Sequence, residues 1–267
     1  IGTAKPTKKE MGGIKHYLLD YVSPTQRYSV ADYKADAKKA IKEILDKGKV
    51  PIVVGGTGLY VDSLIYEIEY PNIEFDEEYR TKLEKEVREN GLNELYLKAK
   101  KIDPIAIEKI SCNDKKRILR ILEIFKATGK TKTEVEQESR KNEPEYDYKV
   151  YALLWDRNKL YNRINSRVDI MMKQGLIDEV KNILNKYDTF PTAMQGLGYK
   201  EVVQYLNGEC TKEEMVEKIK KETRRYAKRQ MTWFRKNKQT IWLDAGDRQN
   251  NINIILEGIN WKKVLIN

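Results

Sequence analysis

The chain has 267 residues, of which 34% are charged and 40% hydrophobic, and its formal net charge at pH 7 is +10. This length allows two unequal parts, a large core and a smaller satellite domain, and the positive charge indicates a polyanionic partner, nucleic acid before an anionic membrane surface. The two cysteines lie far apart without a CxxC or Cys/His pattern, and no apolar run approaches the roughly 20 residues that span a bilayer. These features argue against a disulfide framework, a zinc site and a membrane protein, so we expect a soluble protein in the cytoplasm.

The first predicted elements form a strand–helix–strand unit. Residues 15–20 are a short strand candidate, and residues 30–47 form an amphipathic helix with Ser29 as its N-cap. The β-branched run of residues 52–54 is typical of a strand that is buried on both faces. This order predicts a parallel sheet with a right-handed crossover.

The stretch PIVVGGTGLY, residues 51–60, is the one around which the rest of the prediction is built. Gly55 and Gly56 end the strand, and because they lack a Cβ the backbone can bend sharply or approach a ligand closely. Thr57 then places a hydroxyl group at the carboxyl end of the strand, where ligands bind in open α/β sheets. A plain strand-to-helix turn without a ligand is the structural alternative.

The middle of the chain has a helical pattern. The acidic stretch of residues 67–76 contains Pro71 and interrupts the pattern before it, so we place a domain boundary there. Helices are expected from residue 77 to about residue 129, with Asp76 and Asn113 among their N-caps. Residues 131–146 are charged and poor in apolar side chains, and we expect them to form a mobile arm.

The predicted helix of residues 114–128 carries a cluster of cations. Its apolar side chains, up to Phe125, face a core, while Lys116, Arg117 and Arg120 project elsewhere. Lys116 and Arg120 are four residues apart and Arg117 and Arg120 three apart, so these cations share one face. They form either a solvated helix face or a binding surface.

The second half of the chain returns to the sheet. Residues 149–155 form a buried strand, and a helix over residues 159–174 follows it. Arg163 and Arg167 lie four residues apart on this helix, close to the predicted ligand edge of the sheet. Paired arginines at that edge suit a phosphate or diphosphate, although arginines on a helix surface are also common.

The last third contains a glycine-bearing turn and a long basic helix, followed by a strand over residues 240–243 and a helix over residues 249–258. Gly196 and Gly198 do not form a dinucleotide-binding fingerprint, because no third glycine follows and no strand precedes them. A capping box, Thr211 with Glu214, starts the long helix, which reaches about residue 236. Its cations alternate with aromatic residues, as in proteins that bind single-stranded nucleic acid, unless the aromatic residues belong to the core. The residues concerned are Arg224, Arg225, Lys228, Arg229 and Arg235 with Tyr226, Trp233 and Phe234.

Several stretches together resemble the tRNA dimethylallyltransferases, also called tRNA isopentenyltransferases. Each stretch is a weak signal alone, but their order and spacing over essentially the whole chain are highly specific. They are IGTAKPT (1–7), YSVADY (28–33), VGGTGLY (54–60), NDKKRILRILEI (113–124), RINSRVD (163–169), GLI (175–177), GLGYKE (196–201) and TRRYAKRQMTWFR (223–235).

The resemblance implies an α/β fold with two parts. A P-loop-kinase-like core, with a parallel sheet flanked by helices, would occupy residues 1–73 and 148–267, and an all-helical tRNA-binding insertion would occupy residues 74–147. The enzyme would transfer the dimethylallyl group of dimethylallyl diphosphate to N6 of the adenine 3′-adjacent to the anticodon in tRNA. Mg²⁺ would accompany the diphosphate, and the enzyme would act as a monomer.

The same resemblance implies roles for single residues. Thr57 and Arg167 would be catalytic, with Thr57 beside the reacting adenine and Arg167, together with Arg163, on the diphosphate. The insertion would contact tRNA through Arg80 and through the consecutive residues Lys116, Arg117, Ile118, Leu119 and Arg120. Further tRNA contacts would come from Gln195, Gly196, Leu197, Gly198, Tyr199 and Lys200, and from Arg224, Lys228 and Arg229 of the long helix.

One departure from the family pattern concerns the phosphate-binding loop. Members of the family have, upstream of IGTAKPT, a first strand, a P-loop and a DSMQVY segment whose Asp is the proposed general base, whereas no GxxxxGK[ST] occurs in these 267 residues. No metal ligand can therefore be assigned here. We expect an incomplete chain that binds tRNA weakly, with salt-sensitive affinity, and transfers nothing. An adenylate isopentenyltransferase and a catalytically dead RNA-binding module stay open as alternatives.

Overall fold

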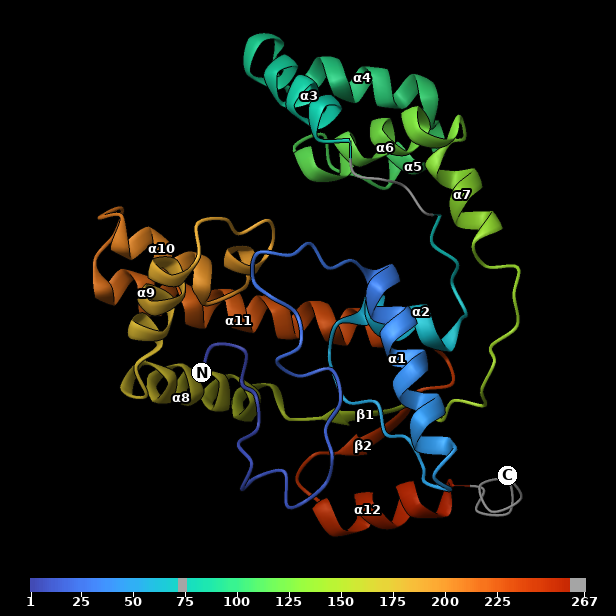
Figure 1. Cartoon of the computed structure of the whole chain (residues 1–267), viewed down its shortest axis with the longest axis vertical. Helices are drawn as coiled ribbons and strands as arrows, with labels where there is room; N and C mark the ends of the chain where they lie inside the picture. The colour runs from blue at the N-terminus through green and yellow to red at the C-terminus, as the bar shows by residue number, and fades with distance from the viewer. Residues whose placement is uncertain (72–75, 260–267) are drawn as a thin grey trace. The chain divides into compact units, whose positions relative to one another are not determined.

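The computed structural model describes residues 1–71 and 76–259, and its chain divides into two compact units (Figure 1). Unit 1 combines Ile1–Val61 with Asp147–Asn267, and unit 2 is Asp62–Tyr146. The predicted boundary between residues 73 and 74 lies outside the described residues, whereas the second predicted boundary falls one residue after the end of unit 2.

Unit 1 is mostly helical, and several of its helices begin where the sequence predicts. Ser29 accepts a hydrogen bond from the backbone amide of Asp32 at the start of α1, and Thr211 and Glu214 form the predicted capping box of α11. The elements of unit 1 are α1 (Val30–Leu45), α2 (Gly58–Ile65, which continues into unit 2), β1 (Tyr151–Leu154), α8 (Arg157–Lys173), α9 (Leu176–Lys186), the 3₁₀ turn η1 (Ala193–Gln195), α10 (Tyr199–Leu206), α11 (Lys212–Phe234), β2 (Ile241–Asp244) and α12 (Arg248–Glu257).

The sheet of the described residues consists of β1 and β2, which pair in parallel from Tyr151 opposite Ile241 to Leu154 opposite Asp244. The parallel arrangement was predicted, but the strands predicted over residues 15–20 and 52–54 are not present. The side chain of Ile52 is 74% exposed and that of Val54 88% exposed. A strand buried on both faces needs a hydrogen-bonded neighbour and a cover on each face, and no described strand pairs with this run.

The strand prediction for residues 149–155 is confirmed in position and wrong in burial. β1 lies within that range, yet Leu153 is 59% exposed and Leu154 42% exposed. The reason is the same as for residues 52–54, since among the described residues β1 pairs with β2 alone.

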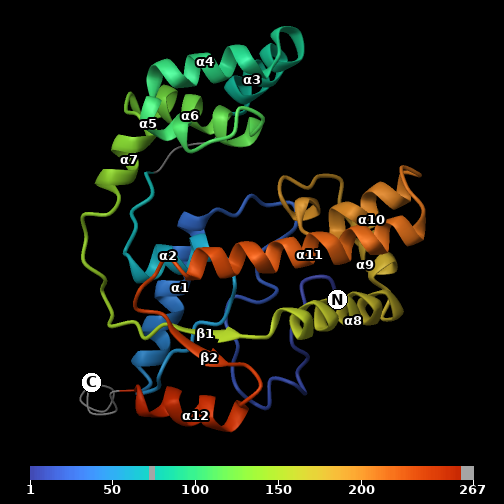
Figure 2. The same ribbon diagram turned by 180° about the vertical axis from the view of Figure 1, so that it is seen from behind.

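The core of unit 1 lies between its helices rather than on the sheet. Val168 of α8, Val180 of α9, Val202 of α10 and Ile219 of α11 are at most 2% exposed and belong to one hydrophobic cluster. α11 packs against both α8 and α10. Near its C-terminal end, Gln230 bonds to Gly56, just before the start of α2 (Figure 2). This long helix is therefore the element that connects the separate parts of unit 1.

Unit 2 is a bundle of helices, and side chains cap α3, α5, α6 and α7. Asp76 caps α3 as predicted, whereas α6 is capped by Asp114 rather than by the neighbouring Asn113, because it is the Asp114 carboxylate that accepts the amide of Arg117. The elements of unit 2, apart from the end of α2, are α3 (Glu77–Asn90), α4 (Leu92–Ile102), α5 (Pro104–Glu108), α6 (Lys115–Thr128) and α7 (Lys132–Glu138).

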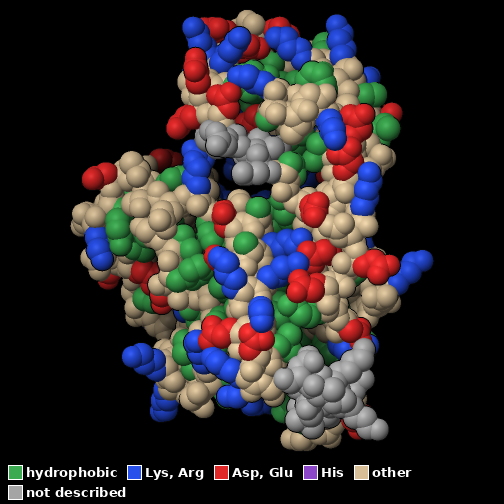
Figure 3. Space-filling model, turned by 45° about the vertical axis from the view of Figure 1, so that its right-hand side comes forward, with side chains coloured by type: hydrophobic (Ala, Val, Ile, Leu, Met, Phe, Trp, Pro, Cys, Tyr) green, Lys and Arg blue, Asp and Glu red, His purple; other side chains and the backbone are tan. Residues whose placement is uncertain are grey.

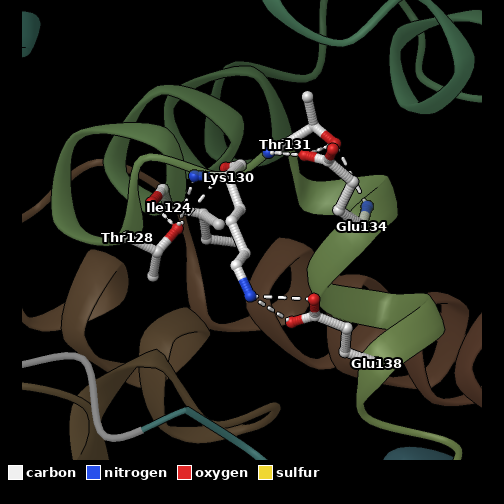
Figure 4. A network of polar contacts seen from close by, with 6 residues as sticks. All are labelled: Ile124, Thr128, Lys130, Thr131, Glu134 and Glu138. Atoms are coloured by element: carbon white, nitrogen blue, oxygen red, sulfur yellow. Dashed lines mark hydrogen bonds and ion pairs between the residues drawn. The ribbon is translucent and has the colours of Figure 1, made fainter.

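The stretch that was predicted to be a mobile arm contains α7, so this prediction is wrong at residues 131–138. Thr131 and Glu134 form a capping box at the start of the helix (Figure 4). The ammonium group of Lys130 donates to both carboxylate oxygens of Glu138, at 2.8 and 2.7 Å. Local hydrogen bonds thus order a segment that has few apolar side chains.

The core of unit 2 is formed largely by α4 and α6. Ile118, Leu119 and Ile121 of α6 are completely buried, and Leu95 of α4 is 1% exposed. Phe125 departs from the predicted apolar face because its side chain is 40% exposed. The face of α6 that carries Ile118 and Leu119 is thus fully used in holding unit 2 together.

Candidate functional site

The GGTG loop, residues 55–58, is held against α11. The Nε2 group of Gln230 donates to the backbone carbonyl of Gly56 over 2.9 Å, and a Cβ on Gly58 would lie 2.3 Å from the indole ring of Trp233. The carbonyl of Thr57 accepts the amides of Tyr60 and Val61, at 2.9 and 3.1 Å, and so starts α2. The Thr57 residue itself is exposed.

Aromatic residues lie beside this loop. Tyr60 of α2 stacks on Tyr33 of α1 with ring centroids 4.3 Å apart, while Tyr21 and Tyr28 meet edge to face at 5.9 Å. Burial raises the pKa of both stacked phenols above the ordinary value, so they stay neutral at physiological pH. Planar, uncharged rings three residues from Thr57 provide a surface on which a nucleobase can stack. The contact between the two rings was missed from the sequence, because Tyr33 was predicted only as part of a helix.

Arg163 and Arg167 of α8 are exposed, and neither forms an ion pair with a described residue. The guanidinium of Arg163 lies over the ring of Trp155, 4.6 Å from its centroid, which orients this side chain without neutralising it. Asp156 accepts the amides of residues 158 and 159 and so fixes the start of α8. The positive charge of Arg163 and Arg167 thus remains available for an anion.

α11 contacts both α8 and the GGTG loop. Arg224 donates to the side-chain oxygen of Asn165 on α8 over 2.6 Å, and Gln230, which contacts the loop, lies six residues later, or about 9 Å along the helix axis. Among the described residues, no hydrogen bond joins Thr57 to Arg167, and the bonds at the two ends of the site run through α11. The structure therefore links the predicted base-binding and diphosphate-binding residues through one helix rather than through a direct contact.

The rest of the basic helix is exposed where RNA contacts were predicted. Lys228 and Arg229 are exposed, and Arg229 lies over the ring of Tyr226 at 5.7 Å from its centroid. Tyr226 and Trp233 are 37% and 36% exposed, so these two aromatic residues are not core residues. Cations and partly exposed rings on one helix are what a single-stranded RNA segment can use for phosphate contacts and stacking.

The strip of residues 195–200 is only partly accessible. Gln195 and Lys200 are exposed, whereas Gly198 is buried. Gly198 is the N-cap residue of α10 and has a positive φ of 94°, which glycine adopts readily. The hydroxyl group of Tyr199 donates to Glu179 and is used inside unit 1. Direct polar contacts with a ligand therefore fall mainly to Gln195 and Lys200.

Glu123 organises the predicted RNA-binding arginines of unit 2. Its carboxylate lies 2.6 Å from Arg80 and 3.6 Å from Arg120, and Arg80 also pairs with Glu84 at 3.1 Å. The Arg80 side chain is only 23% exposed, whereas that of Arg120 is 49% exposed. Glu123 was missed because a single acidic residue within a basic helix carries no pattern.

Two of the predicted tRNA contacts in unit 2 are wrong. Ile118 and Leu119 are 0% exposed and belong to the hydrophobic cluster, so their side chains cannot reach a bound RNA. The neighbouring Lys116 and Arg117 are exposed, in agreement with the predicted cationic face. On the face shown in Figure 3, basic and acidic side chains are mixed at the top, where unit 2 lies. The positive charge of this face is therefore confined to small groups of side chains.

The described residues form neither a metal cluster nor a membrane-spanning helix. Over residues 1–71 and 76–259, no three His, Cys, Asp or Glu side chains gather in a way that could hold a metal ion. In the same part of the chain, no helix has the length and apolar character required to cross a bilayer.

Comparisons with known proteins place this geometry in a family. A family model described as IPP transferase matches residues 1–237. The tRNA dimethylallyltransferase of Acetivibrio thermocellus is 50% identical over 256 residues, which cover 96% of this chain and 82% of that protein. The tRNA dimethylallyltransferase of Caldanaerobacter subterraneus is 49% identical over 92% of this chain and 79% of its own length.

Solved structures agree with the sequence comparisons. The full-length tRNA isopentenylpyrophosphate transferase from Bacillus halodurans aligns with a TM-score of 0.69 and 39% identity, over 98% of this chain and 84% of that one. A eukaryotic dimethylallyltransferase described as acting on tRNA aligns with a TM-score of 0.77 and 27% identity, over 96% and 68% of the two chains. The mostly helical chain with its small parallel sheet therefore belongs to the IPP transferase family.

Proposed function

We propose, in place of the expectation that the chain transfers nothing, that the protein transfers the dimethylallyl group of dimethylallyl diphosphate to N6 of the adenine that follows the anticodon of tRNA. The observation that carries this proposal is the anchoring of the exposed Thr57 loop on the basic, aromatic helix α11, in a chain of the IPP transferase family. The tRNA dimethylallyltransferases that share about half of its residues support the same activity.

The reaction exchanges one bond for another at the first carbon of the dimethylallyl group. Adenine N6 attacks this carbon, the carbon–oxygen bond breaks, diphosphate leaves with the electron pair, and N6 loses a proton. Negative charge grows on the diphosphate as the bond breaks, so Arg163 and Arg167 stabilise the transition state more than the ground state. Both side chains are exposed and have no described ion-pair partner that would compete.

Mg²⁺ belongs to the proposal as the companion of the diphosphate. The described residues do not provide a cluster of three metal ligands, so this chain's described side chains do not form a magnesium site by themselves. A magnesium ion that enters with its substrate is held mainly by phosphate oxygens and water, with one or two carboxylates. The work assigned to the described residues is therefore anion binding and positioning.

The acceptor adenine has to leave its stack to reach Thr57, which costs a few kcal/mol. Stacking on the partly buried rings beside the loop and phosphate contacts from α11 offset this cost. The proposed tRNA contacts are the exposed residues of the predicted set, namely Lys116, Arg117, Arg120, Gln195, Lys200, Lys228 and Arg229, together with the partly buried Arg80 and Arg224. Gly196, Leu197, Gly198 and Tyr199 would shape the strip between Gln195 and Lys200, and the protein would act as a monomer in the cytoplasm.

A competition assay tests the proposed acceptor. The protein is incubated with labelled dimethylallyl diphosphate, Mg²⁺, tRNA and AMP, and the label is located by nucleoside analysis. Label on the tRNA adenine supports the proposal, and label on AMP supports the adenylate isopentenyltransferase alternative. Binding of tRNA without transfer to either acceptor supports the RNA-binding module. The cationic face of α6 favours tRNA over AMP as the acceptor. A tRNA has many phosphates that cations on a second helical unit can bind, whereas a free nucleotide has one phosphate group.

A further inference from the structure

Two side chains of α11 fill the space in which side chains of the GGTG loop would otherwise lie. A Cβ on Gly56 would lie 1.9 Å from Nε2 of Gln230, and a Cβ on Gly58 would lie 2.3 to 2.5 Å from three atoms of the Trp233 indole. Real Cβ atoms do not approach other heavy atoms so closely. Neither glycine has a positive φ, so at Gly58 it is close packing against the Trp233 ring, and not backbone conformation, that requires glycine, whereas at Gly56 a side chain would displace the amide end of Gln230.

The two contacts lie on either side of Thr57. Gly56 precedes it and is held by the 2.9 Å hydrogen bond from Gln230, while Gly58 follows it and is held by the Trp233 ring. Gln230 and Trp233 are three residues apart and therefore lie on the same face of α11. On the indole, the ammonium group of Lys236 lies 5.4 Å from the ring centroid, which adds a cation–π contact to its packing.

We propose that Gln230 and Trp233 are positioning residues that set the place of the Thr57 hydroxyl group relative to α11. This proposal rests on the proposed function, because it assigns the loop its role beside the adenine. The same helix carries Arg224, Lys228 and Arg229, so an RNA segment bound to α11 is held at a fixed position relative to Thr57. A loop free to shift by about 1 Å loses as much as 100-fold in rate even when binding is unchanged.

The first test removes the hydrogen bond in the full chain and follows hydrogen–deuterium exchange. Gln230→Glu keeps the shape of the side chain but replaces the donor by a carboxylate, which repels the Gly56 carbonyl. Gln239→Glu adds the same charge to unit 1 at an exposed position outside the loop and is the matched control. The amides of Tyr60 and Val61, which bond to the Thr57 carbonyl, report the state of the loop.

We expect Gln230→Glu to speed exchange at these two amides by roughly 3- to 10-fold, as for the loss of one hydrogen bond, with no change in the peptides of α8 and α10. Gln239→Glu should leave the rates at wild-type values. Equal exchange in both variants and wild type would overturn the positioning role, whatever the protein transfers. Faster exchange over all of unit 1 would also overturn it, because that result indicates a general structural role.

The second test uses compensation between Gly58 and Trp233. Gly58→Ala alone collides with the indole, whereas Gly58→Ala in the Trp233→Ala background does not. We expect Gly58→Ala to speed hydrogen–deuterium exchange at the amides of Tyr60 and Val61. This increase should be at least 10-fold larger in the wild-type background than in the Trp233→Ala background. Equal effects in the two backgrounds would contradict the assigned contact.

The kinetic consequence separates this proposal from the proposed function. Gln230→Met, which removes the donor without adding charge beside Lys228 and Arg229, should lower kcat for prenyl transfer by roughly 10- to 100-fold with a tRNA dissociation constant within twofold of wild type. Loss of tRNA affinity with unchanged kcat would overturn the positioning role. A wild-type protein that transfers nothing to tRNA refutes the proposed function, and the exchange measurements still decide how the loop is held.

Discussion

The cationic face of α6 predicts how strongly tRNA binding should depend on salt concentration. Lys116 and Arg120 are exposed and lie four residues apart, and they are proposed to contact two phosphates of tRNA. Replacing both by Gln removes the charges but keeps the hydrophilic stems, so the buried face with Ile118 and Leu119 should be unaffected. The free energy of unfolding should therefore stay near the wild-type value.

The expected effect lies in the salt dependence of tRNA binding. Each phosphate contact contributes about 0.7 to 0.9 to the slope of log K against log salt concentration, so the double variant should lose about 1.4 to 1.8 from this slope. Between about 50 and 200 mM salt, the wild type should then lose roughly 7- to 12-fold more affinity than the variant. Filter binding or fluorescence anisotropy over a salt series measures the slope directly.

A matched control keeps the test specific. Lys100→Gln with Lys101→Gln removes the same charge from unit 2, at exposed positions on and near the end of α4 that are not among the proposed contacts. These changes should leave the slope close to that of the wild type. If both pairs of substitutions reduce the slope equally, tRNA responds to the net charge of unit 2, and the assignment of a contact face on α6 is refuted.

Three further predictions concern single side chains. Arg167→Ala should weaken the use of dimethylallyl diphosphate, seen as a raised KM or a lowered kcat in steady-state kinetics, while tRNA affinity stays within about twofold; the reverse pattern would reject this role. Asp103→Ala should lower the free energy of unfolding by about 2 to 3 kcal/mol in urea titrations, because the buried carboxylate accepts the Ala106 amide and two bonds from Thr133. Burial raises the pKa of Asp103, but these hydrogen bonds lower it more, so the net pKa lies below the ordinary value. The contribution of Asp103 to the free energy of unfolding is therefore present above about pH 4 and lost as pH falls through the lowered pKa. The alanine variant should not show this loss. Glu123→Gln should raise the salt slope of tRNA binding slightly by releasing Arg80, and an unchanged slope would show that Glu123 does not restrain this arginine.

The helices were predictable because their signals are local. Ser29 with Asp32 and Thr211 with Glu214 are capping pairs within one turn, and the structure confirms the helices that they begin. The strand predicted at residues 52–54 failed because burial on both faces depends on neighbours that a local pattern cannot specify. The β-branched run shows that these residues favour the extended conformation. Whether they form a strand depends on pairing with another strand.

The site residues divide in the same way. Arg163, Arg167 and the cations of α6 and α11 could be proposed because charge at helical spacing is visible in the sequence. Ile118 and Leu119 were assigned to tRNA although the apolar period already placed them on the core face, and that period proved the better guide. Gln230 was missed because its partner, Gly56, lies 174 residues away.

Photo-crosslinking tests the central claim, that the GGTG loop and the end of α11 meet the adenine that follows the anticodon. An anticodon stem–loop RNA with a photoreactive azidoadenine at that position is irradiated with the full chain, and the attached peptides are identified by mass spectrometry. We predict attachment within residues 55–61 or 224–234, suppressed by unmodified tRNA and not by AMP. Attachment confined to α12, or attachment that AMP suppresses and tRNA does not, would contradict the account.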